Sequence, residues 1–308
     1  MNVLSLFDGC SCGMAALDHA GIKVDNYWAS EVDKYAIQIS KKNWPHIQHI
    51  GDVCGVDATA MDVDLLIGGS PCQGFSFAGK QLNFDDPRSR LFFEYVRIKT
   101  ECNPKWFLLE NVKMRQESQD IISEALGVEP VEINSALVSA QNRKRLYWTN
   151  IPFDMPEDKG ILLKDILECE TSEYVKVSKR GQYKKFQDKA SCLSGGAHSG
   201  GNHSDMDLIG RCIQVSEAIG IKGHEHMRRV YSVYGKSPTV TAICGGNQER
   251  KIAVNDYEWR RYTPIECERL QTLPDNYTEG VSNTQRYKML GNGWTRDIIA
   301  HIFKGMKQ

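Results

Sequence analysis

The sequence has almost no net charge and no long apolar segment. Its 308 residues carry 38 lysines and arginines against 39 aspartates and glutamates, a formal net charge of −1. That balance is not typical of a polycationic nucleic-acid coat or of a basic membrane-surface protein. No stretch approaches the roughly 18 apolar residues of a membrane span. The opening MNVLSLFDGC lacks the basic segment and long apolar core of a secretion signal. We therefore expect a soluble intracellular protein.

Cysteine pairs with C-x-x-C spacing are also absent, although the chain has ten cysteines. None of them forms a C-x-x-C pair, so the spacing of zinc ribbons and fingers is missing and no metal site is expected. Without a secretion signal, these thiols should be reduced and mostly buried. Cys10 and Cys12 are the closest two. At most one or two of the ten should have a chemical role.

Apolar strands alternate with amphipathic helices in the first half of the chain. Strand-like runs cover residues 3–7, 26–31, 64–68 and 106–111, and helical patterns cover residues 14–20, 34–43 and 90–100. Strands that alternate with helices, and that are apolar on both faces, are typical of a parallel sheet covered by helices on both sides. The pattern predicts an α/β fold with a doubly wound parallel sheet.

The pattern changes in the second half of the chain. Residues 154–249 are richer in Gly, Ser and His and have weak periodicity, and apolar signals return at residues 261–273 and 297–303. We expect one α/β domain interrupted by an insert. Residues 1–155 together with 257–308 would form the larger domain, and residues 156–256 the smaller inserted one.

The segment FDGCSCG, residues 7–13, follows the first predicted strand, where backbone N–H groups can face a ligand. It lacks the G-x-G-x-x-G spacing that holds a dinucleotide pyrophosphate. Glu31 ends the second strand, where an acid can accept hydrogen bonds from ribose hydroxyls, and Asp52 offers another acceptor. Together they indicate a nucleoside ligand, for which S-adenosylmethionine is a natural candidate. Taken singly, each is more readily explained as a turn glycine or a solvated acid.

The segment GGSPCQGFS carries a stronger signal. Its Cys72 lies just beyond the carboxyl end of a buried strand, the edge where ligands bind in open α/β sheets. Pro71 restricts the backbone before the thiol, and residues 73–90 resemble a loop that closes over a site. A thiolate here can act as a nucleophile. The alternative is a buried structural thiol, which we expect for the other nine cysteines.

Three charged residues complete the candidate chemistry. Glu110 ends the strand WFLLEN and should project at the same sheet edge as Cys72, where desolvation can keep a carboxyl group protonated. Strand alternation sends Arg143 and Arg145 to one face, where they can hold an anionic or carbonyl group by forked hydrogen bonds. A surface acid and a solvated basic loop are the alternatives.

In combination these motifs resemble the DNA (cytosine-5)-methyltransferase family. The motifs that carry the resemblance run in family order from Phe7 to Trp294: FDGCSCG, SEVD, GDV, GGSPCQGFS, ENV, QNRKR, RRYTPIECERLQTLP and LGNGW. LSLFDGCSCG, SEVD and RLFFEYVR are especially similar to the animal de novo enzymes, whereas RRVYSVYGKSPTVTAICGGN resembles the recognition region of bacterial and phage members. The resemblance implies a Rossmann-like S-adenosylmethionine methyltransferase domain with an inserted target-recognition domain.

The resemblance also implies a mechanism. Carbon 5 of cytosine is a poor nucleophile, and attack of the Cys72 thiolate at carbon 6 would make carbon 5 electron-rich. Glu110 would hold N3 and the exocyclic amine, Arg145 would contact O2, and Arg143 would steady the pocket. The methyl group then moves to carbon 5, leaving S-adenosylhomocysteine, and loss of the carbon-5 proton releases Cys72. The cytosine must be flipped out of the duplex to be reached.

Binding residues follow from the same resemblance. Phe7 should stack on adenine, Glu31 should hold the ribose, and Asp52 should hold the adenine amine. The remaining cofactor contacts are expected from Gly9, Cys10, Ser11, Val32, Val53, Pro71, Leu91, Asn292 and Trp294. DNA contacts are expected from Gln73, Ser76, Arg228, Arg229, Thr239, Thr241, Gly245 and Gly246. The basic stretch 176–189 should contact phosphates, which fix register without reading sequence.

The resemblance also implies the substrate and partners of the protein, and it leaves some alternative functions open. Double-stranded DNA is the expected substrate, with a cognate restriction endonuclease as a candidate partner and a monomer as the expected state, in the cytoplasm of a prokaryotic or phage-infected cell. A related tRNA cytosine-5 methyltransferase is one alternative, but its Cys-Phe-Thr signature is absent. A catalytically silent DNA-binding relative, and transfer of a modified methyl group, are two others.

Overall fold

The computed structural model describes residues 1–70, 87–168, 174–176, 183–185, 214–218, 224–242, 250–253 and 259–307. The strands are β1 (Asn2–Leu6), β2 (Asn26–Ser30), β3 (Gln48–Gly51), β4 (Leu65–Gly68), β5 (Trp106–Val112), β6 (Val131–Asn134), β7 (Lys144–Thr149), β8 (Tyr174–Lys176), β9 (Tyr183–Lys185), β10 (Gln214–Glu217), β11 (Arg229–Tyr231), β12 (Lys251–Ala253) and β13 (Trp259–Arg261). The helices are α1 (Cys12–His19), α2 (Lys34–Asn43), α3 (Pro87–Cys102), α4 (Gln116–Leu126), α5 (Glu225–Arg228), α6 (Pro264–Leu270), α7 (Asn283–Asn292) and α8 (Arg296–Lys304).

A seven-stranded sheet with the order β3-β2-β1-β4-β5-β7-β6 organises the larger lobe. The five strands from β3 to β5 are parallel, as the sequence predicts. The expectation of a wholly parallel sheet is wrong at the other edge, because β7 runs antiparallel to both β5 and β6. Residues 135–143, which connect β6 to β7, are too few for the crossover that a parallel pair needs.

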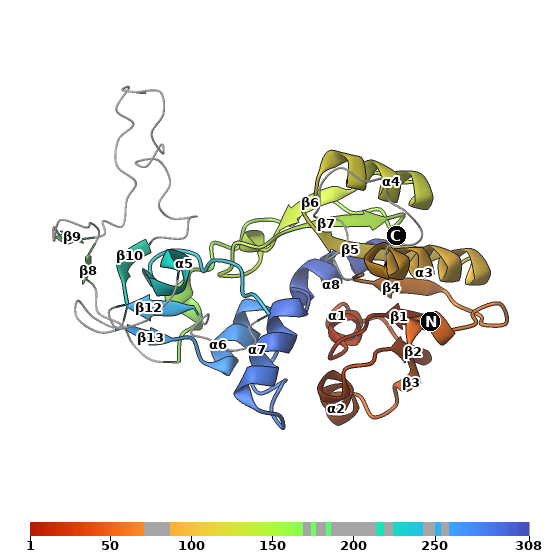
Figure 1. The fold of residues 1–308 in the computed structure, drawn as a ribbon, viewed down its shortest axis with the longest axis horizontal. Coiled ribbons are helices and arrows are strands. Elements are labelled where there is room, and N and C mark those ends of the chain that lie inside the picture. The colour runs from red at the N-terminus through yellow and green to blue at the C-terminus, as the bar shows by residue number, and fades with distance from the viewer. Residues whose placement is uncertain are drawn as a thin grey trace.

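Helices cover both faces of this sheet, so its central strands are apolar throughout. Strand β1 shows the division, since Val3 belongs to one buried cluster and Leu4 to another. The Val3 cluster holds residues of α1 and α8, which pack against each other, and the Leu4 cluster holds residues of α3 and α4 (Figure 1). The predicted α/β class, with helices on both sides of the sheet, is confirmed.

The smaller lobe contains the sheet β10-β11-β12-β13, on the left in Figure 1. Because β13 pairs with β12, this sheet continues past residue 256, where we expected the insert to end. A third buried cluster joins the lobes, since it contains Ile39 of α2, Ile252 of β12 and Leu270 of α6. The segment from residue 259 to residue 307 therefore contributes to both lobes. Its strand β13 belongs to the sheet of the smaller lobe, and its helix α8 packs in the larger lobe.

Candidate active site

A cavity of about 570 Å³ opens at the carboxyl ends of the parallel strands. Residues that follow β1, β2, β3 and β4 line it, together with the last residues of β5 and the end of α7. This edge is where open α/β sheets bind their ligands, because the strand ends and the helix N-termini leave backbone groups facing the opening. The cavity is therefore the candidate site.

The loop after β1 is held in an unusual backbone conformation. Phe7, Gly9 and Ser11 have φ angles of 57°, 60° and 62°, in the left-handed region that only glycine adopts without strain. The Glu31 carboxylate braces this loop. Its Oε2 accepts a hydrogen bond from the Gly9 N–H at 2.7 Å, and its Oε1 accepts from the N–H groups of Val32 and Asp33. Glu31 thus fixes one wall of the cavity and keeps lone pairs for a ligand.

Asp8 is a buried carboxylate under the same loop. The hydroxyls of Tyr27 and Ser11 donate to it, the first at 2.7 Å. Burial raises the pKa of Asp8 to about 6 because desolvation disfavours its charged form, and the hydroxyl donors oppose that rise only in part. The glycines of this motif were considered from the sequence, and the role of Asp8, which precedes Gly9, was missed.

Replacing Asp8 by asparagine should change how stability depends on pH. Since folding raises this pKa from its ordinary 3.8 to about 6, the stability that neutral Asp8 supports is present below pH 3.8 and is lost as pH rises through about 6. The Asp8→Asn variant does not titrate there. Urea unfolding from about pH 4 to about pH 7 should show the variant gaining about 2 kcal/mol relative to the wild type. A difference that stays constant with pH would contradict this account.

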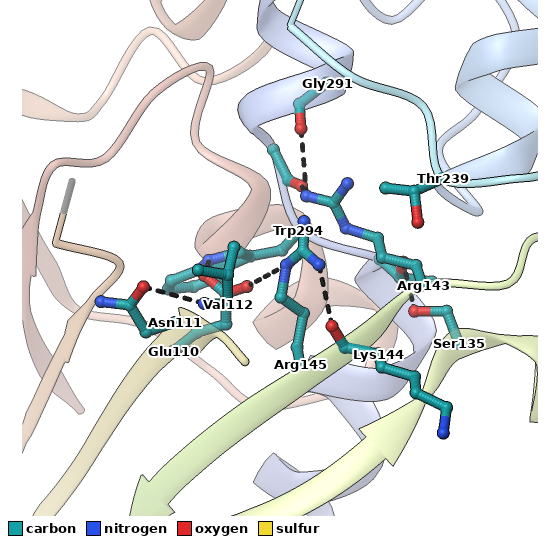
Figure 2. A network of polar contacts seen from close by, with 12 residues as sticks. Glu110, Asn111, Val112, Ser135, Arg143, Lys144, Arg145, Thr239, Gly291 and Trp294 are labelled. Carbon is teal, nitrogen blue, oxygen red and sulfur yellow. Dashed lines mark hydrogen bonds and ion pairs between the residues drawn. The ribbon is translucent and has the colours of Figure 1, made fainter. Parts of the chain in front are cut away.

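Glu110 and Arg145 form an ion pair at the far wall of the cavity. Arg145 Nε lies 3.0 Å from Glu110 Oε1, and both side chains are largely buried. The Trp294 indole N–H donates to Glu110 Oε2 at 3.1 Å. Figure 2 shows Arg145 reaching Glu110 and also the carbonyl of Lys144. Both carboxylate oxygens are therefore oriented by fixed donors.

Arg143 lies behind this pair and has a different role from Arg145. It is 2% exposed and donates to three backbone carbonyls, those of Val240, Gly291 and Gly293, at 2.9 to 3.1 Å. Burial lowers its pKa to about 10, and the positive charge of Arg145 acts in the same direction. Arg143, which immediately precedes β7, thus ties the start of that strand to the Val240 segment of the smaller lobe and to the end of α7. Figure 2 shows its contact with Gly291.

The chain that leads to Cys72 is anchored at the same wall. The Asn111 side-chain amide donates to Oγ and to the carbonyl of Ser70, at 3.2 and 3.3 Å. Gly69 packs so closely that a Cβ there would lie 3.0 Å from Trp294 Nε1 and 3.2 Å from Glu110 Oε2. The described chain therefore stops beside Glu110, two residues before Cys72 in the sequence.

Most of the predicted site residues meet at the cavity. Its lining includes Phe7, Gly9, Cys10, Glu31, Val32, Asp52, Val53, Leu91, Glu110, Arg143, Arg145, Asn292 and Trp294. Ser11 is not among the lining residues, because its hydroxyl turns towards Asp8 and Ser40. Pro71, Cys72, Gln73, Ser76, Gly245 and Gly246 lie outside the described residues.

The four described residues predicted to bind DNA lie in the smaller lobe. Arg228 and Arg229 pair with Glu217 and Glu225, at 3.5 and 3.6 Å. The Thr239 hydroxyl donates to the carbonyl of Asn142, and Thr241 is exposed. Their contacts with DNA stay predictions.

Two further contacts at the cavity had no recognisable signal in the sequence. Lys288 of α7 pairs with Asp33, which caps α2, at 2.7 Å, and both line the opening. The Tyr277 hydroxyl donates to the Cys10 carbonyl at 2.8 Å. Both contacts join residues more than two hundred positions apart, so no local pattern could reveal them.

Within the described ranges, no helix has the length and apolar character to cross a membrane. Across the same part of the chain, no group of three or more His, Cys, Asp or Glu side chains is arranged to hold a metal ion.

The fold and the site define a class: a Rossmann-like enzyme whose cofactor-sized cavity adjoins a carboxylate–arginine pair. All of the chain, residues 1–308, matches the family described as C-5 cytosine-specific DNA methylase, and the chain belongs to this family. It is therefore a DNA cytosine-5 methyltransferase, as the motifs predicted, and the tRNA alternative is not favoured.

Relatives from bacteria and phages are similar over nearly the whole chain. The type II methyltransferase M1.ScrFI of Lactococcus lactis subsp. cremoris is 31% identical over 94% of this chain and 73% of its own length. The orphan methyltransferase M.SPRI of Bacillus phage SPR is 26% identical over 99% of this chain and 97% of its own.

Solved structures share the fold. A DNA modification methyltransferase encoded within an E. coli prophage has a TM-score of 0.68 and 22% identity, with 100% of this chain and 98% of that chain covered. The S. pombe Dnmt2 methyltransferase has the same TM-score and 18% identity, with coverage of 99% and 97%.

Proposed function

We propose that this methyltransferase acts on cytosine in double-stranded DNA through Cys72, with Glu110 and Arg145 holding the flipped-out base. The Glu110–Arg145 ion pair beside the cavity carries the proposal. A cytosine presents N3 and an exocyclic amine next to O2, and a carboxyl group beside a guanidinium offers matching partners. Trp294 fixes the second carboxylate oxygen, so Glu110 is already oriented before the base arrives.

The cavity wall fits S-adenosylmethionine as the cofactor. Family members use it, and when bound it supplies an electrophilic methyl group. Phe7 offers an aromatic face, Glu31 offers acceptors for ribose hydroxyls, and Asp52, which accepts the Cys54 N–H, offers a second carboxylate. Asn292 lines the same cavity, and Trp294 lies at the part of it that adjoins Glu110. Phe7, Glu31 and Asp52 would thus hold the nucleoside away from the reacting centre.

Each residue of the catalytic wall then has a distinct task. The Cys72 thiolate forms the bond to carbon 6 of cytosine. Glu110 takes up a proton from solvent when the base binds and supplies that proton to N3 as charge develops there. Arg145 holds O2 through its guanidinium. Arg143 is a positioning residue, since its donors are taken up by backbone carbonyls. Loss of the carbon-5 proton and of the thiolate completes the reaction.

We also propose a division of tasks between the two domains and a biological setting for the enzyme, both based on its family. Residues 156–256 would recognise the target, with β13 continuing their sheet, and residues 1–155 and 257–308 would carry catalysis. The type II relatives suggest a restriction–modification setting with a cognate endonuclease, and phage relatives suggest a protective role without one. We propose that the protein works as a monomer in the cytoplasm of a bacterial or phage-infected cell.

Bisulfite sequencing of DNA from a host that expresses the protein tests the function directly. Protected cytosines should fall within one short recurrent sequence. In purified form, the enzyme should transfer labelled methyl groups to duplex DNA and not to tRNA. Methylation of tRNA alone would overturn the proposal.

A further inference from the structure

Two thiols in the cavity wall have no part in this mechanism. Cys10 and Cys12 both line the cavity, and their sulfur atoms lie 3.8 Å apart. Their side chains are 2% and 4% exposed, so the cavity is their route to solvent. Cys54, by contrast, is an exposed surface thiol.

The loop conformation explains why these thiols meet. Ser11, between the two cysteines, has a left-handed backbone conformation, and its hydroxyl forms hydrogen bonds with Asp8 and Ser40. The Tyr277 hydroxyl holds the Cys10 carbonyl from the other side. With the backbone fixed in this way, the two sulfur atoms stay in contact without a covalent bond.

We propose that Cys10 and Cys12 form a dithiol modification site, which a small disulfide oxidises to a protein disulfide that weakens cofactor binding. The proposal rests on the proposed function, which assigns this cavity to S-adenosylmethionine. The Cys12 thiolate attacks one sulfur of the oxidant and releases the first small thiolate. Cys10 then loses its proton and attacks the Cys12 sulfur, releasing the second. One disulfide is reduced to two thiols while the two cysteines are oxidised.

The surroundings favour Cys12 as the attacking group. The hydrogen bond from the Cys10 thiol lowers the pKa of Cys12, and the Trp294 backbone N–H and the charge of Arg143 act in the same direction. The same contact raises the pKa of Cys10, which therefore resolves the mixed disulfide.

Oxidation must disturb the cavity wall. A disulfide requires the sulfur atoms to approach to about 2.05 Å, well inside their present separation of 3.8 Å. Cys12 packs against the turn after α7, where a Cβ on Gly293 would lie 3.3 Å from its sulfur. The Gly9 N–H is held by Glu31 on the other side of the loop. Closing the disulfide therefore moves residues that bind the cofactor.

Calorimetric titration with S-adenosylhomocysteine tests the proposal. The experiment uses the Cys72→Ser variant, which removes the reactive nucleophile, before and after treatment with bis(2-hydroxyethyl) disulfide. We expect a Cys10–Cys12 disulfide in the peptide map and affinity weaker by roughly tenfold or more. By linkage, bound S-adenosylhomocysteine should disfavour oxidation by the same factor, about 30 mV for a tenfold change. Reduction should restore binding.

Matched variants separate the outcomes. Cys12→Ser, added to Cys72→Ser, should make affinity insensitive to the oxidant, because it removes the attacking thiol. Cys10→Ser should stop the reaction at a mixed disulfide on Cys12, which a peptide map detects, while Cys54→Ser should leave the formation of the Cys10–Cys12 disulfide intact. Two free thiols at Cys10 and Cys12 after treatment, or a disulfide without loss of affinity, would overturn the inference alone. A reduced protein that fails to bind S-adenosylhomocysteine would overturn the proposed cofactor site as well.

Discussion

Glutamine in place of Glu110 is expected to lower the rate of methyl transfer by about 10³-fold, the usual scale of a lost general acid. The amide keeps an oxygen that can accept the Trp294 indole N–H, so the side chain should stay in place. It cannot supply a proton to N3, and it leaves the Arg145 guanidinium without its carboxylate partner. Single-turnover assays on duplex DNA measure the chemical step directly.

Glu132→Gln is the matched control for this change. Glu132 lies on the edge strand β6 of the same sheet and pairs with Lys113 and Lys144 at the surface, at 2.9 and 3.4 Å. Its replacement should leave the rate nearly unchanged, because exposed ion pairs contribute little. S-Adenosylhomocysteine should bind both variants as it binds the wild type. A Glu110→Gln enzyme within tenfold of the wild-type rate would refute Glu110 as the proton donor.

Methionine in place of Arg143 is expected to cost about 3–5 kcal/mol of folding free energy. Methionine has similar length but no donor, so the carbonyls of Val240, Gly291 and Gly293 lose their shared partner in a buried place. The midpoint of thermal unfolding should fall by about 5–8 °C for a chain of this size. Calorimetry and circular dichroism give the midpoint.

Arg115→Met provides the comparison for Arg143→Met. Arg115 is exposed and precedes α4, so the same change there should alter stability by no more than about 0.5 kcal/mol. Equal midpoints for the two variants would mean that Arg143 does not tie the lobes together. A normal midpoint with lost activity would instead make Arg143 a substrate contact.

Local pattern was sufficient for much of the larger lobe. The helix α2 covers the residues that periodicity predicts, and β1, β2, β4 and β5 each agree with the predicted strands within about two residues. Glu31 and Glu110 each end one of the predicted strands, and because the carboxyl ends of parallel strands share one edge, both line the cavity. The order of motifs then indicated the family, which the comparisons confirm.

The sequence by itself therefore determined the parallel half of the sheet, the edge at which the cavity opens and the reaction class, since these follow from periodicity and motif order. Only the tertiary structure decided that β7 runs antiparallel, that Arg143 binds carbonyls of two distant segments and that Trp294 orients Glu110. It also brought Tyr277 to the Cys10 carbonyl. Contacts of this kind depend on how helices and loops pack against one another. The residues on either side of each position in the chain do not predict that packing, because the partners are far apart in the sequence.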